Sequence, residues 1–161
     1  MHKVLGVIFL AILLTACSNN TVVSSYKTIK NGWDKDEPVS FTLEAPDTTN
    51  AYNVFINVRN NDEYQYSNLY IIVNMSFPEG ETLTDTLQYE MANAQGAWLG
   101  KGISAVKESK LWYKENVKFP KKGIYTVSVE QAMRKNGKKE GIASLKGITD
   151  VGIDIEKTKN N

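Results

Sequence analysis

Histidine and cysteine are almost absent from this sequence. Of the 161 residues, the only histidine is His2 and the only cysteine is Cys17. Histidine is the commonest general acid or base near neutral pH and the commonest metal ligand, and thiolates form the soft metal sites. Composition therefore excludes the chain after Cys17 from the Ser-His-Asp and Cys-His hydrolases, the histidine-ligated zinc enzymes and the thiol oxidoreductases. It also excludes an internal disulfide, so packing must stabilise the domain.

A charge bias is missing as well. The 19 Lys and Arg residues nearly balance the 18 Asp and Glu residues, and the formal net charge is +1. Such a balance does not favour nucleic acid or an acidic membrane surface as a partner of the whole chain. No Gly-rich loop precedes a helix, so the sequence predicts no nucleotide site, and we expect no cofactor.

The chain begins with an apolar leader. Lys3 precedes an uncharged apolar run at 4–14, about half of the roughly 20 residues needed to cross a bilayer, which is typical of a signal peptide. The segment Leu14–Cys17 (Leu-Thr-Ala-Cys) also fits the lipobox of bacterial lipoproteins, in which the cysteine carries acyl chains such as palmitate. We predict a cleaved signal peptide at 1–16 and lipidation of Cys17. The alternative is an ordinary signal peptide with a coincidental cysteine.

Apolar and polar residues alternate through most of the chain that follows. We expect a lipidated tether at 17–25 and then a domain at 26–161, whose first segment, 26–38, is a loop with Trp33 lying over one end of the core. The period of two is typical of half-buried strands, and turn residues separate the runs. The expected strands are 39–45, 52–59, 69–77, 82–91, 111–119, 124–130 and 148–156.

These strands predict an all-β fold in a single domain. An antiparallel β-sandwich of about seven or eight strands fits the pattern, with a small closed barrel as the alternative. We expect 52–77 to form two antiparallel strands joined by a loop, and 120–123 (Pro-Lys-Lys-Gly) to form a hairpin turn. Asp85 interrupts the inner face of its strand, which indicates a bulge or a position at the edge of a sheet.

The acidic residues do not show the spacing of a catalytic or metal site. Asp34, Asp36 and Glu37 lack the alternate ligands and the central glycine of a calcium loop. A glycoside hydrolase needs two facing carboxylates, and nothing in the sequence places two loop acids opposite each other. We therefore expect no enzymatic activity and no metal, with a carboxylate-dependent glycoside hydrolase as the alternative.

Loop residues with aromatic and amide side chains are the stronger binding signal. Aromatic side chains bind sugar faces and also anchor protein interfaces. The expected recognition surface consists of Arg59, Asn60, Asn61, Tyr64, Tyr66 and Trp98. Packing in the core is the alternative for its aromatic members.

Several spaced segments carry a resemblance to one family. They are Leu14–Cys17, Val58–Asn61, Tyr66–Leu69, Gly96–Gly102, Phe119–Tyr125, Glu130–Arg134 and Gly147–Lys157. In this order, over nearly the whole chain, they are similar to the gliding motility lipoproteins of the GldH type from the Bacteroidota. The resemblance implies an envelope lipoprotein needed for gliding and associated with type IX secretion, with no established enzymatic activity. Only Cys17, the lipidated residue, carries over.

The sequence thus predicts a non-enzymatic lipoprotein that acts as an accessory or scaffold of an envelope assembly. Its expected partners are the membrane, through the lipid anchor, and other envelope proteins. No acidic run follows Cys17 of the kind that surface-exported lipoproteins of this phylum carry, so the periplasmic face of the outer membrane is favoured. The alternative function is a glycan-binding outer-membrane lipoprotein that uses Tyr64, Tyr66 or Trp98 as a platform.

Overall fold

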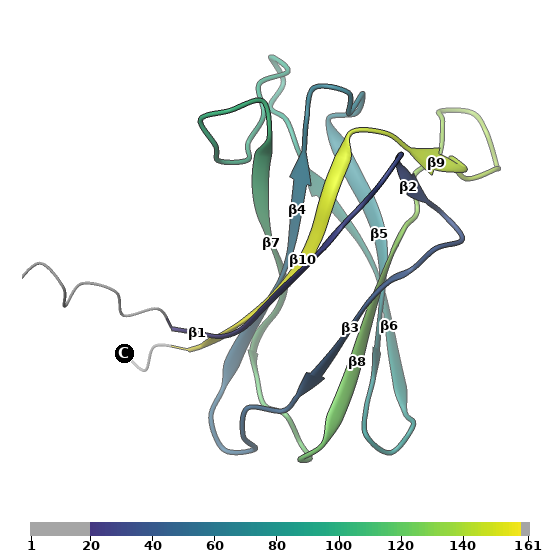
Figure 1. Ribbon diagram of the computed structural model, residues 1–161. Helices are drawn as coiled ribbons and strands as arrows, with labels where there is room; N and C mark the ends of the chain where they lie inside the picture. The colour runs from purple at the N-terminus through teal and green to yellow at the C-terminus, as the bar shows by residue number, and fades with distance from the viewer. Residues whose placement is uncertain (1–19, 159–161) are drawn as a thin grey trace, which may run out of the picture.

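Ten antiparallel strands form the architecture of a computed structural model that describes residues 20–158 (Figure 1). The first sheet has the order β1-β10-β4-β7, the second sheet has the order β3-β8-β5-β6, and β2 pairs with β9. The bounds are β1 Thr21–Thr28, β2 Trp33–Asp34, β3 Val39–Glu44, β4 Tyr52–Asn60, β5 Asn68–Ser76, β6 Thr82–Glu90, β7 Lys107–Val117, β8 Ile124–Gln131, β9 Ser144–Leu145 and β10 Ile148–Lys157. The predicted all-β fold and β-sandwich are confirmed. Within the described range, no helix is long and apolar enough to cross a membrane.

The core lies between the facing sides of the two sheets. Because side chains alternate between the faces of a strand, every second residue of the central strands is buried. Those with at most 1% exposure are Val54, Ile56 and Val58 on β4, Leu69, Ile71 and Val73 on β5, Tyr125, Val127 and Val129 on β8, and Val151, Ile153 and Ile155 on β10. Full burial of one such aliphatic side chain contributes roughly 1.5–3 kcal/mol, so this interior is the main source of stability.

Most chain connections pass from one sheet to the other. Among consecutive strands of residues 20–158, only β5 and β6 pair with each other. The hairpin expected at 120–123 is wrong, because β7 and β8 lie in different sheets. Phe119 shows why: its ring packs against Tyr52 at 5.8 Å and against Tyr125 at 5.1 Å, so this connection spans the core. The antiparallel pair expected at 52–77 is wrong for the same reason, because β4 and β5 lie in different sheets. A period of two shows which face of a strand is buried but not which sheet the strand joins.

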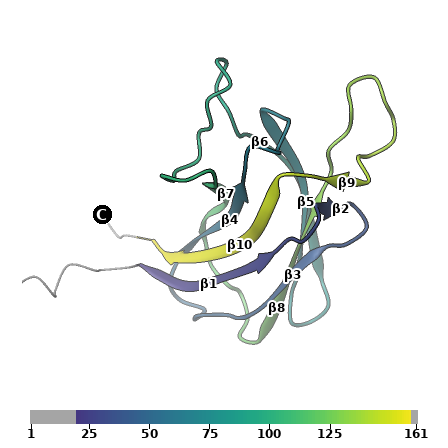
Figure 2. The ribbon, with the colours of Figure 1, turned by 45° about the horizontal axis from the view of Figure 1, so that its top comes forward.

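Strand β1 begins inside the segment that the sequence assigns to a tether. The predicted tether at 17–25 is wrong from Thr21 onward, because β1 runs antiparallel beside β10 from Thr21 to Thr28 (Figure 2). Main-chain pairing holds this strand, and the Ser24 hydroxyl adds a 2.7 Å hydrogen bond to Asp154. An edge strand held in this way does not need an apolar face, so its sequence does not reveal it. The predicted loop at 26–38 likewise contains the end of β1 and the short β2, whose Trp33 is 1% exposed.

Side chains close the sandwich where β6 faces β7. Tyr89 Oη donates to the carbonyl oxygen of Trp112 at 2.5 Å, and Tyr113 Oη donates to Asp85 Oδ2 at 3.0 Å. Lys114 Nζ lies 2.8 Å from the same carboxylate oxygen. β6 is an edge strand in unbroken register with β5, so Asp85 marks a sheet edge and not a bulge.

Replacing Asp85 by asparagine is expected to weaken the domain in a pH-dependent way. Hydrogen bonds from Lys114 and Tyr113 hold the pKa of the Asp85 carboxyl below its usual value. The carboxylate therefore stabilises the fold fully above its unfolded pKa, and this contribution is lost as the pH falls through the lower folded pKa. We expect Asp85→Asn to lower the unfolding free energy by about 1–2 kcal/mol at neutral pH, and the difference to shrink below about pH 4. Urea unfolding at both pH values measures it; Glu81→Gln, at an exposed acid, is the control, and a difference independent of pH would contradict the prediction.

Candidate recognition surfaces

The loop between β4 and β5 is shaped by Asn61 and by a close approach of Gly147. The Asn61 side-chain oxygen accepts a hydrogen bond from the Glu63 N–H at 3.0 Å. The main-chain carbonyl oxygen of Asn61 accepts one from the Tyr64 N–H at 3.1 Å. The Asn61 N–H donates to the Gly147 carbonyl oxygen at 2.9 Å. Gly147 has φ 84° and lies so near Tyr64 that a Cβ atom would come 2.0 Å from the Tyr64 nitrogen. These bonds and the close approach of Gly147 hold the main chain of the loop where the Tyr64 side chain is buried.

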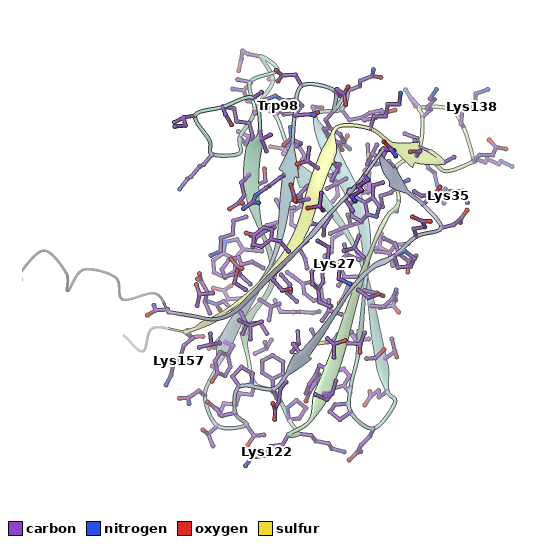
Figure 3. All side chains as sticks on the ribbon, in the orientation of Figure 1. Lys27, Lys35, Trp98, Lys122, Lys138 and Lys157 are labelled. Atoms are coloured by element: carbon purple, nitrogen blue, oxygen red, sulfur yellow. The ribbon has the colours of Figure 1, made fainter. Side chains whose placement is uncertain are left out.

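The aromatic residues predicted as a binding platform pack against one another. The Tyr64 ring lies 5.7 Å from that of Tyr66 and 6.1 Å from that of Trp98. Tyr64 is 3% exposed, its hydroxyl donates to the Asn68 carbonyl oxygen at 2.6 Å, and burial raises the pKa of its phenol. Trp98, near one end of the sandwich (Figure 3), donates from its indole to Asp62 at 3.3 Å. This cluster extends the core, and only its rim reaches solvent.

The six predicted surface residues do not share one surface. Asn60 is 1% exposed and Tyr64 is 3% exposed, which corrects the expectation that they contact a ligand. Asn61 serves the turn, and Tyr66 and Trp98 are half-buried at the loop end. Arg59 points to the outer face of the first sheet. There its Nε lies 2.6 Å from Glu108 Oε2, and its guanidinium carbon lies 4.4 Å from the centre of the Tyr26 ring.

A glycine permits this stacking on the outer face of the first sheet. Tyr26 pairs with Gly152, and a Cβ atom there would come 2.6 Å from the Tyr26 ring. The ring therefore lies across β10 and meets Arg59 on β4. Burial and the nearby carboxylates of Asp154 and Glu108 raise the Tyr26 pKa to about 12, so the phenol stays protonated at neutral pH.

Asn57 lies in the middle of this outer face. It is 1% exposed, and within residues 20–158 neither its amide nitrogen nor its amide oxygen has a hydrogen-bond partner. It follows Phe55 and Ile56 on β4 and pairs with Lys110 on β7. Buried amides are normally hydrogen-bonded, so this group stands out among the polar side chains of the face.

Next to Asn57, an aromatic pair reaches the surface. The rings of Phe55 and Trp112 are 4.4 Å apart, and Trp112 is 53% exposed. Lys110 Nζ lies 4.4 Å from the centre of the Phe55 ring, 2.5 Å from Glu156 Oε1 and 3.7 Å from Asp154 Oδ2. One lysine thus faces two acidic residues in this part of the face, and the exposed indole is its most prominent apolar group.

An apolar loop projects beside the beginning of β7. Leu99 is 53% exposed, Val106 is 37% exposed and Ile103 is fully exposed. Two mutual hydrogen bonds of 2.8 Å between the main chains of Lys101 and Glu108 fix the base of the loop. We did not predict this feature, although the sequence contains a signal for it: the apolar residues at 103–106 lie between two lysines, and 99–107 contains no acid.

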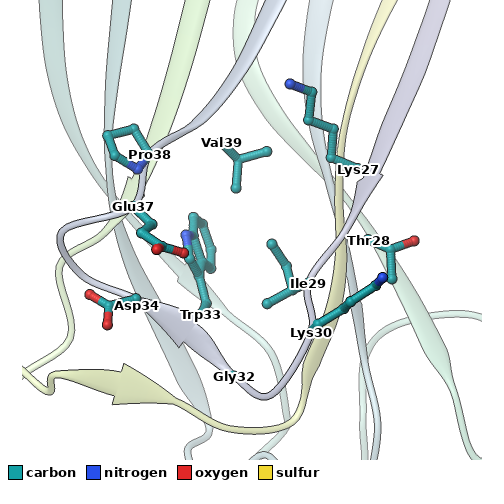
Figure 4. A pocket seen from close by; sticks show the side chains of 10 residues that line it. All are labelled: Lys27, Thr28, Ile29, Lys30, Gly32, Trp33, Asp34, Glu37, Pro38 and Val39. Carbon is teal, nitrogen blue, oxygen red and sulfur yellow. The ribbon is translucent and has the colours of Figure 1, made fainter.

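Two of the pockets have two acids each in their lining, Asp34 and Glu37 in one and Glu90 and Glu108 in another, and Glu108 is held in the ion pair with Arg59. One of about 320 Å³ surrounds Trp33, which lies between Glu37 and Ile29 (Figure 4) and has Lys27 and Lys30 on the other side. A larger one of about 680 Å³ lies over the second sheet beside the segment after β8, and none of its lining residues is acidic. No group of three or more metal-ligating acidic side chains occurs in the part of the chain that the structure describes.

Known proteins of similar sequence match nearly the whole chain. The model of the GldH lipoprotein family matches residues 21–155, from the first residue of β1 into β10. The chain belongs to the GldH lipoprotein family. A relative from Christiangramia forsetii, named gliding motility lipoprotein GldH homolog, is 52% identical over 153 residues, which is 95% of this chain and 94% of the relative. One from Flavobacterium johnsoniae, named gliding motility lipoprotein GldH, is 47% identical over 152 residues, 94% of both chains.

Solved structures add no functional information to this family assignment. The infectious bursal disease virus VP2 subviral particle matches with a TM-score of 0.33 and 11% identity. The match covers 88% of this chain and 43% of the viral chain, so this GldH family member spans less than half of that protein. At this TM-score the likeness supports no conclusion about partners or activity. The predicted lipidation site, Cys17, lies outside the described residues.

Proposed function

We propose that this protein is a lipid-anchored, non-enzymatic component of the gliding-motility machinery, held on the periplasmic face of the outer membrane. The observation that carries the proposal is the pair of relatives with gliding-motility names, 52% and 47% identical over nearly the whole chain. The Leu14–Cys17 segment supports the anchor, because it places a cysteine directly after small residues at the end of an apolar leader. In this proposal the sandwich is an accessory or scaffold that binds other envelope proteins.

The described chain supports recognition over catalysis. After Cys17 there is no histidine and no thiol, and the larger pocket has no acid in its lining. The packing of Tyr64 removes the centre of the platform on which the glycan alternative rests. The sandwich offers two extended sheet faces and loops held by main-chain hydrogen bonds, and such surfaces suit protein partners.

Crosslinking inside cells tests the scaffold role. A photoreactive amino acid at Gln65, exposed in the β4–β5 loop, is expected to capture a discrete envelope protein. The same group at Glu79, exposed in the turn between β5 and β6 at the other end of the sandwich, is the control and should capture far less. Mass spectrometry identifies the product. Equal labelling from both positions, or no protein from either, would contradict the proposal, and retention of the protein on a polysaccharide matrix would then favour the glycan alternative.

A further inference from the structure

Exposed apolar side chains gather on one side of the domain. Of the eight large apolar side chains that the described residues expose, five belong to the first sheet or to the loop beside it. These five are Val22 on β1, Leu99, Ile103 and Val106 in the loop between β6 and β7, and Trp112 on β7. The other three, Tyr70, Leu83 and Ile124, lie on separate strands of the second sheet. The densest group of exposed apolar side chains is therefore the loop before β7, with Trp112 following on that strand.

The chain leaves the domain on this same side. In both Figure 1 and Figure 2 the start of β1 lies at the left, and the loop between β6 and β7 projects on the left as well. Cys17 precedes Thr21 by four residues, and four extended residues span at most about 14 Å. An acyl chain on Cys17 thus keeps the first sheet close to the bilayer that holds the anchor.

The side chains on this side suit a membrane interface. The loop has Lys101 and Lys107 on either side of the fully exposed Ile103, and no acid occurs between Leu99 and Lys107. Lysines near a bilayer surface are attracted to anionic headgroups, and tryptophan prefers the interfacial region, as Trp112 would here. The near-neutral total charge of the chain conceals this local arrangement.

Two of the acids on the same face are held in close ion pairs. Glu108 is paired with Arg59 at 2.6 Å, and Glu156 is paired with Lys110 at 2.5 Å. Asp154 lies 3.7 Å from the same lysine, and Asp150 accepts a 2.9 Å hydrogen bond from the neutral Thr28 hydroxyl. Because Glu108 and Glu156 are ion-paired, they present less repulsion to an anionic leaflet than free carboxylates, and the attraction comes from the acid-free loop at 99–107 with its lysines.

We propose that the outer face of the first sheet and the loop Leu99–Val106 form a membrane-contact surface. The domain lies with this surface on the leaflet that holds its own anchor, with Ile103 and Trp112 at headgroup depth. The proposal rests on lipidation of Cys17, because the short link to β1 is what brings the surface to the bilayer. The second sheet, with its larger pocket, then faces away from the membrane and is free to bind envelope partners.

Fluorescent labels on the lipidated full-length protein test this orientation. The mature chain has no thiol other than that of Cys17, so Ile103→Cys provides a single labelling site for an environment-sensitive dye once Cys17 is acylated. Thr84→Cys, exposed on the outer face of the second sheet, is the matched control. Both proteins are inserted into vesicles of phosphatidylethanolamine and phosphatidylglycerol with brominated acyl chains. If position 103 lies about 5–10 Å deep in the interface, the emission of the dye attached there should fall at least ~twofold. The emission of the dye at position 84 should change little.

The outcomes separate this inference from the function on which it rests. Mass spectrometry of the same samples reports acylation: a protein without acyl chains would overturn the anchor itself. An acylated protein with equal quenching at both positions, or with none, would overturn the contact surface and leave the anchor intact. If the dye at position 103 became shielded from solvent only after an envelope extract was added, the surface would be a protein interface. That result would also overturn the proposal.

Discussion

Replacing Gly147 by alanine is expected to cost a large part of the stability of the domain. Two effects add up at this position. The φ of 84° is left-handed, which costs an alanine roughly 1–2 kcal/mol, and the new Cβ atom would lie 2.0 Å from the Tyr64 nitrogen. The clashing atoms belong to the main chain, so no side chain can rotate away. Either the loop carrying Tyr64 or the approach to β10 must move.

The cost follows from what that movement breaks. The Gly147 carbonyl oxygen accepts from Asn61, and Tyr64 is part of the core. We expect the free energy of unfolding to fall by more than about 4 kcal/mol, against a total of about 5–15 kcal/mol for a typical domain. The midpoint of urea unfolding, followed by tryptophan fluorescence, measures the change.

Gly80→Ala is the control for backbone strain alone. Gly80 has a similar φ of 91°, and a Cβ atom there would meet nothing within 4 Å. This variant should lose only about 1–2 kcal/mol, the cost of the left-handed conformation. If Gly147→Ala proved no less stable than Gly80→Ala, the close approach to Tyr64 would have no energetic weight, and the explanation of the β4–β5 loop given above would be wrong.

The fold class was predictable because burial and the period of two coincide in the central strands. Strands such as β4 and β10 place Val and Ile on one face, and the sequence shows these faces directly. The order of strands in the sheets was not predictable, since Phe119 bridges the two sheets through contacts that only the folded chain brings together. Strand β1 was missed because its stability comes from main-chain pairing and from hydroxyl contacts such as Ser24 to Asp154, and these leave no apolar pattern.

The candidate recognition residues were predicted less well, for a related reason. The sequence identifies Tyr64 and Trp98 as aromatic residues near strand ends, but their exposure depends on Gly147 and on the packing of Tyr66. Conversely, Ile103 is fully exposed although its side chain is as apolar as any in the core. Residue type predicts what a side chain can bind, and only the fold determines whether a ligand can reach it.

Removing the predicted anchor is expected to move the protein from the membrane to the soluble fraction. Each buried CH₂ of an acyl chain contributes about 0.8 kcal/mol, and a single chain binds only marginally, so stable attachment needs the two or more chains expected on Cys17. Cys17→Ala in the native precursor should abolish labelling by a palmitate analogue. Because this change also blocks lipoprotein processing, the domain from Ser18 onward is placed behind an ordinary cleaved signal peptide as a second variant.

The second variant makes the result decisive. It lacks both the acyl chains and the apolar leader, so only the surface around Ile103 and Trp112 could hold it on a bilayer. A few interfacial side chains bind weakly and reversibly, and we therefore expect more of this protein in the soluble fraction than in the membrane pellet. Ser18→Ala, which leaves the cysteine in place, should keep both the label and the membrane location. Full membrane association of the unacylated domain would show that Cys17 is not the anchor, and it would transfer that role to the face of the sandwich itself.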